Sequence, residues 1–298
     1  MATFLVTGGT GRIGTAFVHE MAARGHTVKL GTRNPEGHAA QLRQRFGPGE
    51  VIPLALPIDD PQSLQKAFEG CTGALLVPPF GEMEAWHQAM STAAAKAGVE
   101  HLVKVSVTGA RGPDSDPPPG RIPSLHWAGE EMVRASGVPC TMIRPTIFSQ
   151  HFLGLSPALY RPGDREIHLP TGETKVAFLD CRDIAICAAE LLHSPDLRAK
   201  YAGQAFELTG SVPVSAAEIA QLLSMVGGRE ITHVDGVEAF SKHAQSIQVS
   251  DMIKGIYMEA AEGWFSTVQD QEFQDIVGRR TTSFAKFAHD HRFFFATP

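Results

Sequence analysis

Three glycines at a regular spacing are the first residues in this sequence whose types suggest chemistry. Gly8, Gly11 and Gly14 lie in VTGGTGRIG, directly after an apolar run and at the start of an amphipathic helical pattern. Glycines at this spacing permit a tight turn and a close backbone approach, and the N–H groups at a helix N-terminus attract phosphate oxygens. The motif therefore predicts a dinucleotide-binding turn, with an ordinary glycine-rich βα turn as the alternative.

The choice of dinucleotide depends on the residues about 20 positions further on. An NAD site usually carries an acidic residue there, but this chain reads GTRNP, and no carboxylate follows until Glu36. Arg33 can pair with a 2′-phosphate, which favours NADP(H) over NAD(H), although an arginine that only faces water is the alternative. Asp59, after the third expected strand, is a candidate for contacts near the adenine or a simple turn residue.

The elements that must position this turn follow from the hydrophobic pattern. Apolar runs alternate with helical patterns in the first half, which predicts an α/β fold with a Rossmann-type, doubly wound parallel sheet and helices on both faces. The helical pattern after the glycines ends at Gly25, and Asp60 with Pro61 has the composition of a helix start. A proline- and glycine-rich irregular loop is expected over 109–123. The expected strands are 3–7, 26–32, 50–56, 73–78, 101–107 and 140–145.

The βα rhythm weakens after about residue 150. We expect an NAD(P)-binding Rossmann domain over 1–150, with 179–210 returning to it, and a smaller C-terminal substrate-binding lobe over 151–178 and 211–298. The run FLDCRDIAICAAELL predicts a helix with Asp183 as its N-cap, and AFELTG (205–210) predicts a further strand. Ser215 and Glu218 have the spacing of a capping box.

Composition narrows the function classes. The chain has 298 residues, a formal net charge of −6, 43% hydrophobic residues and 19% charged residues. No basic field is available for nucleic acid, and the N-terminus has neither a signal-like region nor a run long enough to span a membrane, so we expect a cytoplasmic protein. The four cysteines are widely separated, and the HDH triplet (289–291) falls in an expected surface helix, so no metal site is expected.

The chain resembles the NmrA-like group of the atypical short-chain dehydrogenase/reductase superfamily, which includes triphenylmethane-dye reductases and NADPH quinone reductases. The resemblance covers nearly the whole chain. It implies that Thr10, Arg12, Ile13, Val77 and Pro78 join the glycines around the cofactor, with Ser106, Pro145 and Thr146 at its nicotinamide end. The motifs that carry it are TGGTGRIG, VKVSVTGA, LHWAGEEMVRASGVPCTMIRPTIF, FLDCRDIA and VGRRTTSFAKFAHDH.

The catalytic motif Tyr-x-x-x-Lys of ordinary short-chain dehydrogenases is missing. The matching segment reads HWAGE, with His126 in place of the tyrosine and Glu130 in place of the lysine. Alcohol–ketone chemistry is therefore in doubt, because a developing alkoxide needs a positioned proton donor, whereas a conjugated acceptor can take hydride with little acid catalysis. The resemblance implies that Ser106 and Thr108 lie beside the nicotinamide and that His126 lies across the pocket, with Ser106 and His126 as the catalytic candidates.

Each of these residues also has a structural interpretation. Ser106 could bond only backbone, Thr108 could begin the loop, and His126 could lie in a first helical turn behind a Ser124 cap. Lys104, in the fifth expected strand, is interpreted as an edge or snorkelling lysine whose side chain faces away from Val103 and Val105.

These observations predict an NADPH-dependent oxidoreductase that transfers hydride to a quinone, iminium, enone or cationic dye. Phe148, Phe152 and Leu153 are expected to form an apolar substrate wall, with packing in the core of the second lobe as the alternative. We expect a small apolar or aromatic substrate and a monomer or homodimer. The alternatives are an NADP(H)-sensing regulatory protein without turnover and a non-redox isomerase or cyclase on the same scaffold.

Overall fold

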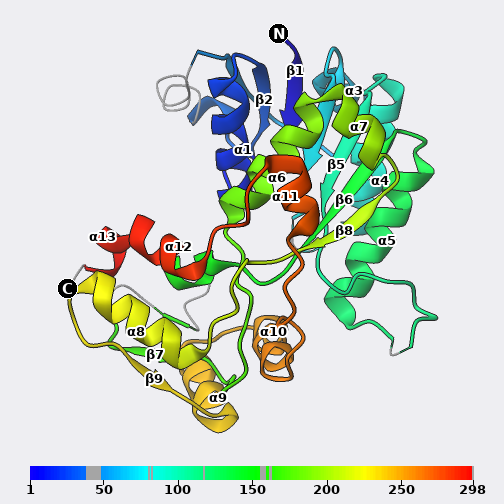
Figure 1. Cartoon of the computed structure of the whole chain (residues 1–298). Helices are drawn as coiled ribbons and strands as arrows, with labels where there is room; N and C mark the ends of the chain where they lie inside the picture. The colour runs from blue at the N-terminus through cyan, green and yellow to red at the C-terminus, as the bar shows by residue number, and fades with distance from the viewer. Residues whose placement is uncertain are drawn as a thin grey trace. The chain divides into compact units, whose positions relative to one another are not determined.

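The computed structural model describes residues 1–37, 48–79, 81, 83–116, 118–154, 159–160 and 163–296. The chain forms two compact units (Figure 1). The first comprises Met1–Pro145 and Ile184–Glu207, and the second comprises Thr146–Asp183 and Leu208–Pro298.

The first unit is built on a seven-stranded sheet in the order β3-β2-β1-β4-β5-β6-β8. Neighbouring strands from β3 to β6 pair in parallel, and the order reverses between β1 and β4, the place where such sheets bind ligands. The predicted Rossmann-type sheet is confirmed, as is the strand predicted near 205. The strands are β1 (Thr3–Val6), β2 (Thr27–Gly31), β3 (Val51–Leu54), β4 (Gly73–Leu76), β5 (His101–Val105), β6 (Cys140–Pro145) and β8 (Ala205–Leu208).

Helices pack on both faces of this sheet (Figure 1). On one face, α1 (Arg12–Ala23) neighbours α6 (Cys181–His193), and Arg24 Nη2 lies 2.6 Å from Glu190 Oε1. On the other face, α3 (Pro61–Phe68), α4 (Met83–Lys96) and α5 (Arg121–Ala135) bury Leu64, Trp86 and Val133 against the strands. The short helix α7 (Pro195–Tyr201) precedes β8.

The structure tests several predictions about which residues cap the N-termini of helices. Asp60 caps α3 as predicted, because its Oδ1 accepts the N–H groups of Gln62 and Ser63 at 3.2 and 3.1 Å. The capping box of Ser215 and Glu218 is confirmed. The prediction that Asp183 caps α6 is wrong.

The helix begins at Cys181, two residues before Asp183. The side chain of Asp180 accepts the N–H of Arg182 at 2.9 Å, so the earlier aspartate occupies the capping place. An irregular loop was expected over 109–123, but the helix α5 already begins at Arg121, directly after Gly120. Ser124 is not its cap, since its Oγ donates backwards to Gly120 O at 2.8 Å. His126 therefore lies in the second turn.

The second unit has its own apolar core. The ring of Phe152 packs against Phe178 and Phe284 with centroid distances of 5.3 and 5.1 Å. Its strands β7 (Glu166–His168) and β9 (Thr232–Val234) pair in parallel. The remaining elements are the 3-10 helix η1 (Ser149–Leu153) and the helices α8 (Ala216–Gly227), α9 (Val237–Ser246), α10 (Asp251–Ala261), α11 (Gln271–Val277), α12 (Phe284–Asp290) and α13 (Arg292–Phe295).

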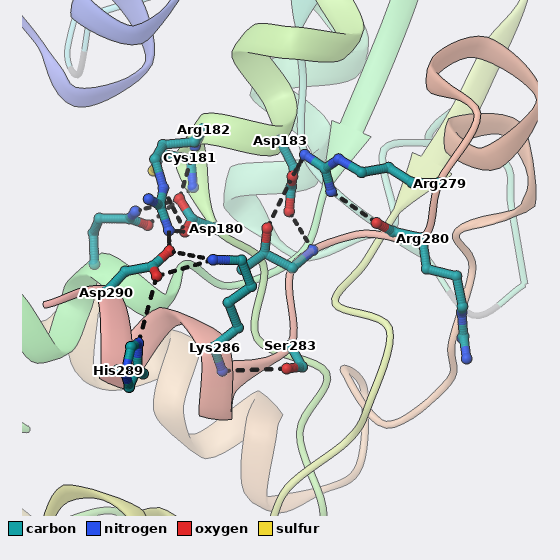
Figure 2. Close-up of polar contacts among 12 residues, drawn as sticks. Asp180, Cys181, Arg182, Asp183, Arg279, Arg280, Ser283, Lys286, His289 and Asp290 are labelled. Atoms are coloured by element: carbon teal, nitrogen blue, oxygen red, sulfur yellow. Dashed lines mark hydrogen bonds and ion pairs between the residues drawn. The ribbon is translucent and has the colours of Figure 1, made fainter. Parts of the chain in front are cut away.

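A buried carboxylate in this unit holds the segment before α12 (Figure 2). Asp183 Oδ1 accepts a hydrogen bond from Arg279 Nη2 at 2.8 Å, and its Oδ2 accepts the N–H of Thr282 at 2.6 Å. Burial raises the pKa of Asp183, and these donors oppose that shift. A second link joins Arg182 to both Asp180 and Asp290, at 2.6 and 2.9 Å. Asp183 thus stabilises a chain segment about 100 residues away instead of capping its own helix.

None of the described helices is both long enough and apolar enough to cross a membrane.

Candidate active site

The glycine turn between β1 and α1 is packed too closely for side chains. Gly8 has φ +59°, in the left-handed region. A Cβ on Gly9 would lie 2.4 Å from Leu30 Cγ, and a Cβ on Gly14 would lie 2.3 Å from the carbonyl oxygen of Gly8. The turn therefore requires the absence of side chains at both positions, which keeps the first turn of α1 against the end of β1.

The N-terminus of α1 has the properties of an anion site. Gly11 occupies the N-cap without a side-chain hydrogen bond, and the first turn of the helix contains no acidic residue. Gly8, Thr10, Gly11 and Arg12 are exposed around it, while Ile13 is buried. The positive end of the helix dipole is thus available to a negatively charged group. The residues present fit the pyrophosphate of a dinucleotide.

Four other predicted cofactor contacts lie next to this turn or after strands of the same sheet. Val77 lies next to the turn, because its N–H donates to Thr7 Oγ1 at 2.7 Å and a Cβ on Gly8 would meet its side chain at 3.7 Å. Pro78 follows it and is half-buried. Arg33 is exposed two residues beyond β2, and Asp59 is exposed in the loop after β3.

Ser106 belongs to a buried ion cluster at the end of β5. Its Oγ donates to Glu130 Oε1 at 2.5 Å. Glu130 is fully buried and also receives Arg144 Nη2 at 2.7 Å and Arg134 Nη2 at 3.1 Å. Burial alone would raise the pKa of Glu130, but the hydrogen bonds from Arg144 and Ser106 and the nearby positive charges hold it below its ordinary value. Glu130 is therefore an ionised anchor, and the Ser106 oxygen can offer only its lone pairs to another group.

Lys104 is fully buried, so its interpretation as an edge or snorkelling residue is wrong. The strand β5 lies between β4 and β6, and both of its faces are covered. The Nζ atom lies 3.4 Å from Val105 O and 3.4 Å from His126 Nδ1. Burial lowers the pKa of Lys104 to about 7, with the charge of Glu130 opposing the shift and those of Arg144 and Arg134 adding to it.

His126 is therefore a neutral ring beside a buried amine. Burial, together with the charge of Lys104, lowers the pKa of His126 to about 2. His87 of α4 lies near the same group, and burial lowers its pKa to about 4. His87 Nδ1 lies 2.5 Å from Met83 O, and a Cβ on Gly129 would lie 2.5 Å from the His87 ring. Glycine at 129 thus allows the ring of His87 to lie directly against α5.

Thr108 starts the proline-rich loop and is held by β8. Its hydroxyl donates to the carboxylate of Glu207, which also accepts the N–H of Gly109 at 3.1 Å. Burial raises the pKa of Glu207, and the two hydrogen bonds oppose this. Ser106 and Thr108 both follow β5, and each is thus hydrogen-bonded to a carboxylate, that of Glu130 in α5 and that of Glu207 in β8.

The other predicted site residues divide between the units. Pro145 is buried at the end of β6 in the first unit. In the second unit, Thr146 is buried with its N–H bonded to Leu208 O at 3.0 Å, and Phe148 is half-buried. Phe152 and Leu153 lie in the hydrophobic core of that unit. This is the place that the alternative interpretation, packing in the core of the second lobe, assigned to them. Residues 155–158 and 161–162 of the expected substrate segment lie outside the described residues.

Sequence reasoning missed the residues that complete the cluster around Lys104 and Ser106. These are His87, Arg134, Arg144 and Glu207. The one sequence signal for this cluster was Gly129, because a glycine inside a helical pattern often indicates that another group packs closely against the helix. Within the described ranges, no group of three or more His, Cys, Asp or Glu side chains could hold a metal ion.

Comparisons with known proteins agree with this architecture. The chain is 31% identical over 295 residues to an NAD(P)H azoreductase of Xenophilus azovorans, covering 96% of this chain and 97% of the relative. It is 29% identical over 296 residues to a (4-alkanoyl-5-oxo-2,5-dihydrofuran-3-yl)methyl phosphate reductase of Streptomyces griseus subsp. griseus, covering 98% and 99%. The crystal structure of an NADPH-dependent quinone oxidoreductase from Escherichia coli shares the fold, with a TM-score of 0.78, 22% identity and coverage of 97% and 99%. A model of the NmrA-like family matches residues 1–280, and the chain belongs to this family.

Proposed function

We propose that this protein transfers hydride from NADPH to a conjugated, apolar electrophile of the quinone, iminium, enone or cationic dye class. The broader class, an NAD(P)H-dependent reductase of the atypical short-chain dehydrogenase type, follows from family membership and from full-length similarity to curated reductases. The observation that carries the proposal is the glycine turn, which excludes a Cβ at Gly9 and Gly14 and faces a helix N-terminus without acidic residues.

The residues around this turn would hold the cofactor. NADPH supplies a hydride equivalent from its nicotinamide ring when bound. Backbone N–H groups and the dipole of α1 would bind the pyrophosphate, and Val77 and Pro78 would flank the dinucleotide. The full set of proposed contacts is Gly8, Thr10, Gly11, Arg12, Ile13, Gly14, Arg33, Asp59, Val77, Pro78, Ser106, Pro145 and Thr146.

A preference for NADPH over NADH is supported by the residues that follow β2. Arg33 is exposed there, and no acidic residue lies between Gly31 and Pro35. A guanidinium can bind a 2′-phosphate, while a carboxylate at this place would repel it.

The substrate class is supported by the groups at positions 126 and 130. Glu130 accepts a hydrogen bond from Ser106 and forms ion pairs with Arg144 and Arg134, so it cannot act as the lysine of a Tyr-x-x-x-Lys motif does. Conjugated acceptors suit such a site because their charge or aromaticity relaxes as hydride arrives, and positioning then supplies most of the acceleration. His126 and Thr108 are the proposed substrate contacts in the first unit.

The proposal is tested by following NADPH absorbance with the purified protein and a panel of quinones, cationic dyes, cyclic imines and enones. We expect oxidation that depends on one class of acceptor and saturates with it. Tight NADPH binding without oxidation across the panel would contradict the proposal and favour the regulatory alternative. Conversion of an acceptor without NADPH consumption would favour the isomerase or cyclase.

A further inference from the structure

The buried amine of Lys104 reaches His126 from the strand and not from the helix. In the ordinary Tyr-x-x-x-Lys arrangement, both residues come from one helix. Here the helix α5 supplies His126 and an ion-paired Glu130, while the amine comes from β5. This chain therefore also has a ring that can carry a proton with an amine beside it. The amine, however, lies on strand β5 and not on helix α5.

The hydrogen positions in this pair follow from the donor and acceptor types. The charged form of Lys104 has only donors, so the atom of His126 that faces it, Nδ1, is the acceptor at 3.4 Å. A neutral imidazole that accepts at Nδ1 carries its hydrogen on Nε2. His126 is partly exposed, and its Nε2 has no hydrogen bond with any residue in the described ranges. The Nε2–H group is therefore available to a bound molecule.

The charged and titratable groups around Lys104 come from three elements. Helix α5 contributes His126, Glu130 and Arg134, strand β6 contributes Arg144, and helix α4 contributes His87. Glu130 favours the protonated amine, whereas the two arginines and burial disfavour it. Because His87 Nδ1 donates to Met83 O, its Nε2 has no hydrogen, and this buried atom has no partner among the described residues. His87 thus adds a neutral acceptor, and no competing acid, to the cluster.

We propose that Lys104 and His126 form a proton relay that serves the reduced substrate. When hydride adds to one atom of a conjugated acceptor, the electron pair of its π bond moves to the far heteroatom. His126 Nε2–H then gives its proton to that heteroatom, while Nδ1 takes a proton from the Lys104 ammonium. The acceptor gains one hydride and one proton, Lys104 becomes a neutral amine, and the ring of His126 changes tautomer.

The relay deepens the proposed function and rests on it. It predicts that acceptors whose reduction consumes a proton, such as quinones, enones and azo compounds, depend on the relay, whereas preformed carbocations do not. The relay is restored when Nε2 of His126 takes a proton from water and Nδ1–H returns its proton to Lys104. Lys104 needs no separate route to solvent, which agrees with its complete burial.

The first test is NMR of the full-length protein labelled with ¹⁵N at histidine and lysine. We expect His126 to remain neutral with the hydrogen on Nε2 from pH 5 to 8, and the Lys104 amine to titrate near neutrality. In Lys104→Met, the pKa of His126 should rise because a neighbouring positive charge has been removed. A hydrogen on Nδ1 of His126 in the wild type, or ¹⁵N chemical shifts of His126 that do not change in Lys104→Met, would overturn the relay without reference to activity.

The second test compares two acceptors with the same protein and NADPH. Menadione needs a hydride and a proton, whereas crystal violet is a cation that needs only hydride. Lys104→Met and His126→Gln should each lower kcat with menadione by about 10²-fold more than they lower kcat with crystal violet, the size of a lost general acid. The double variant should be no slower than either single variant, because either substitution alone already interrupts the relay.

Controls separate the relay from a structural role. Lys29→Met removes another strand lysine, whose Nζ donates to the carbonyls of Ala67 and Glu69, and should leave both reactions unchanged. Lys104→Arg keeps a charge that does not titrate and should not restore the menadione reaction. In the wild type, kcat with menadione should fall as the pH rises above about 7, with no such fall for crystal violet.

Equal losses with the two acceptors would show that Lys104 only supports the structure and would refute the relay. No oxidation of NADPH by the wild type with these two acceptors or with any other acceptor of the panel would instead refute the proposed function, and the NMR result then decides whether the hydrogen-bonded pair exists.

Discussion

The substitution Gly14→Ala gives the sharpest test of the glycine turn. The new Cβ would lie 2.3 Å from Gly8 O and 2.6 Å from Gly9 Cα, both backbone atoms. Carbon and oxygen atoms approach no closer than roughly 3.4 Å without repulsion, so the first turn of α1 must retreat by about 1 Å. Overpacking of this size costs about 1–3 kcal/mol of stability.

The same retreat should weaken cofactor binding. The N–H groups that we propose bind the pyrophosphate belong to the segment that moves, and hydrogen bonds to charged groups contribute about 1.5–3 kcal/mol each. Loss of one such bond corresponds to a Kd for NADPH about 10- to 100-fold higher. Isothermal titration calorimetry measures the Kd, and urea unfolding measures the free energy.

A matched control removes the effect of helix propensity. Gly255 also lies within a helix, α10, and a Cβ there would meet nothing within 4 Å. Gly255→Ala should leave NADPH binding unchanged and raise stability by up to about 1 kcal/mol, as expected for Gly→Ala in a helix. If the two variants have the same stability and the same Kd, the account of the turn is wrong.

Three further predictions follow from the first unit. Arg33→Ala should raise the Kd for NADPH by about 10-fold or more, through loss of a charge-assisted contact, while the Kd for NADH changes little. Arg144→Met should lower the free energy of unfolding by about 3 kcal/mol, because the fully buried Glu130 loses its two shortest arginine contacts. His101→Gln should flatten the pH dependence of stability between pH 7 and 4.5, by about 2.5 kcal/mol, measured by urea unfolding at each pH.

The sign of the His101 prediction follows from linkage. Burial, with the charge of Arg198, lowers the pKa of His101 from 6.5 to about 4. The unfolded chain therefore takes up a proton at a higher pH than the folded protein, so stability is present above pH 6.5 and is lost as the pH falls toward 4. Glutamine can still donate to Thr141 Oγ1, which His101 Nε2 contacts at 2.9 Å. An unchanged pH slope would refute this assignment.

Controls for the other variants use exposed groups. Lys242→Met removes a pair with Glu238 in which both side chains are largely exposed, and should leave stability unchanged, in contrast to Arg144→Met. His289→Gln removes an exposed histidine and should leave the pH dependence intact. Equal weakening of NADPH and NADH in Arg33→Ala would contradict a 2′-phosphate contact.

The sequence predicted what depends on local pattern. The strands, the glycine turn, the cap of Asp60 and the capping box of Ser215 and Glu218 are each determined by residues a few positions apart. Asp180 and Asp183 show the limit of such reasoning, since both types fit a helix start, and the structure shows that Asp180 accepts the N–H of Arg182 while Asp183 binds a distant segment.

The charged cluster could not be predicted in the same way. Ser106 and Glu130 are 24 residues apart, and Thr108 and Glu207 are 99 residues apart, so their contacts depend on strand order. The alternation that suggested an edge lysine at Lys104 has no meaning in a central parallel strand, because both faces of such a strand are buried. The amine was therefore assigned to solvent, although it lies beside the predicted site residue His126.

The most direct test of the central claim is the fate of the hydride. NADPH carrying deuterium at C4, prepared separately for each face, is mixed with the protein and the acceptor that it reduces, and the product is analysed by mass spectrometry. A product that gains one deuterium from one face only is the predicted result. NADPH that binds tightly but transfers no deuterium to any acceptor would contradict the account.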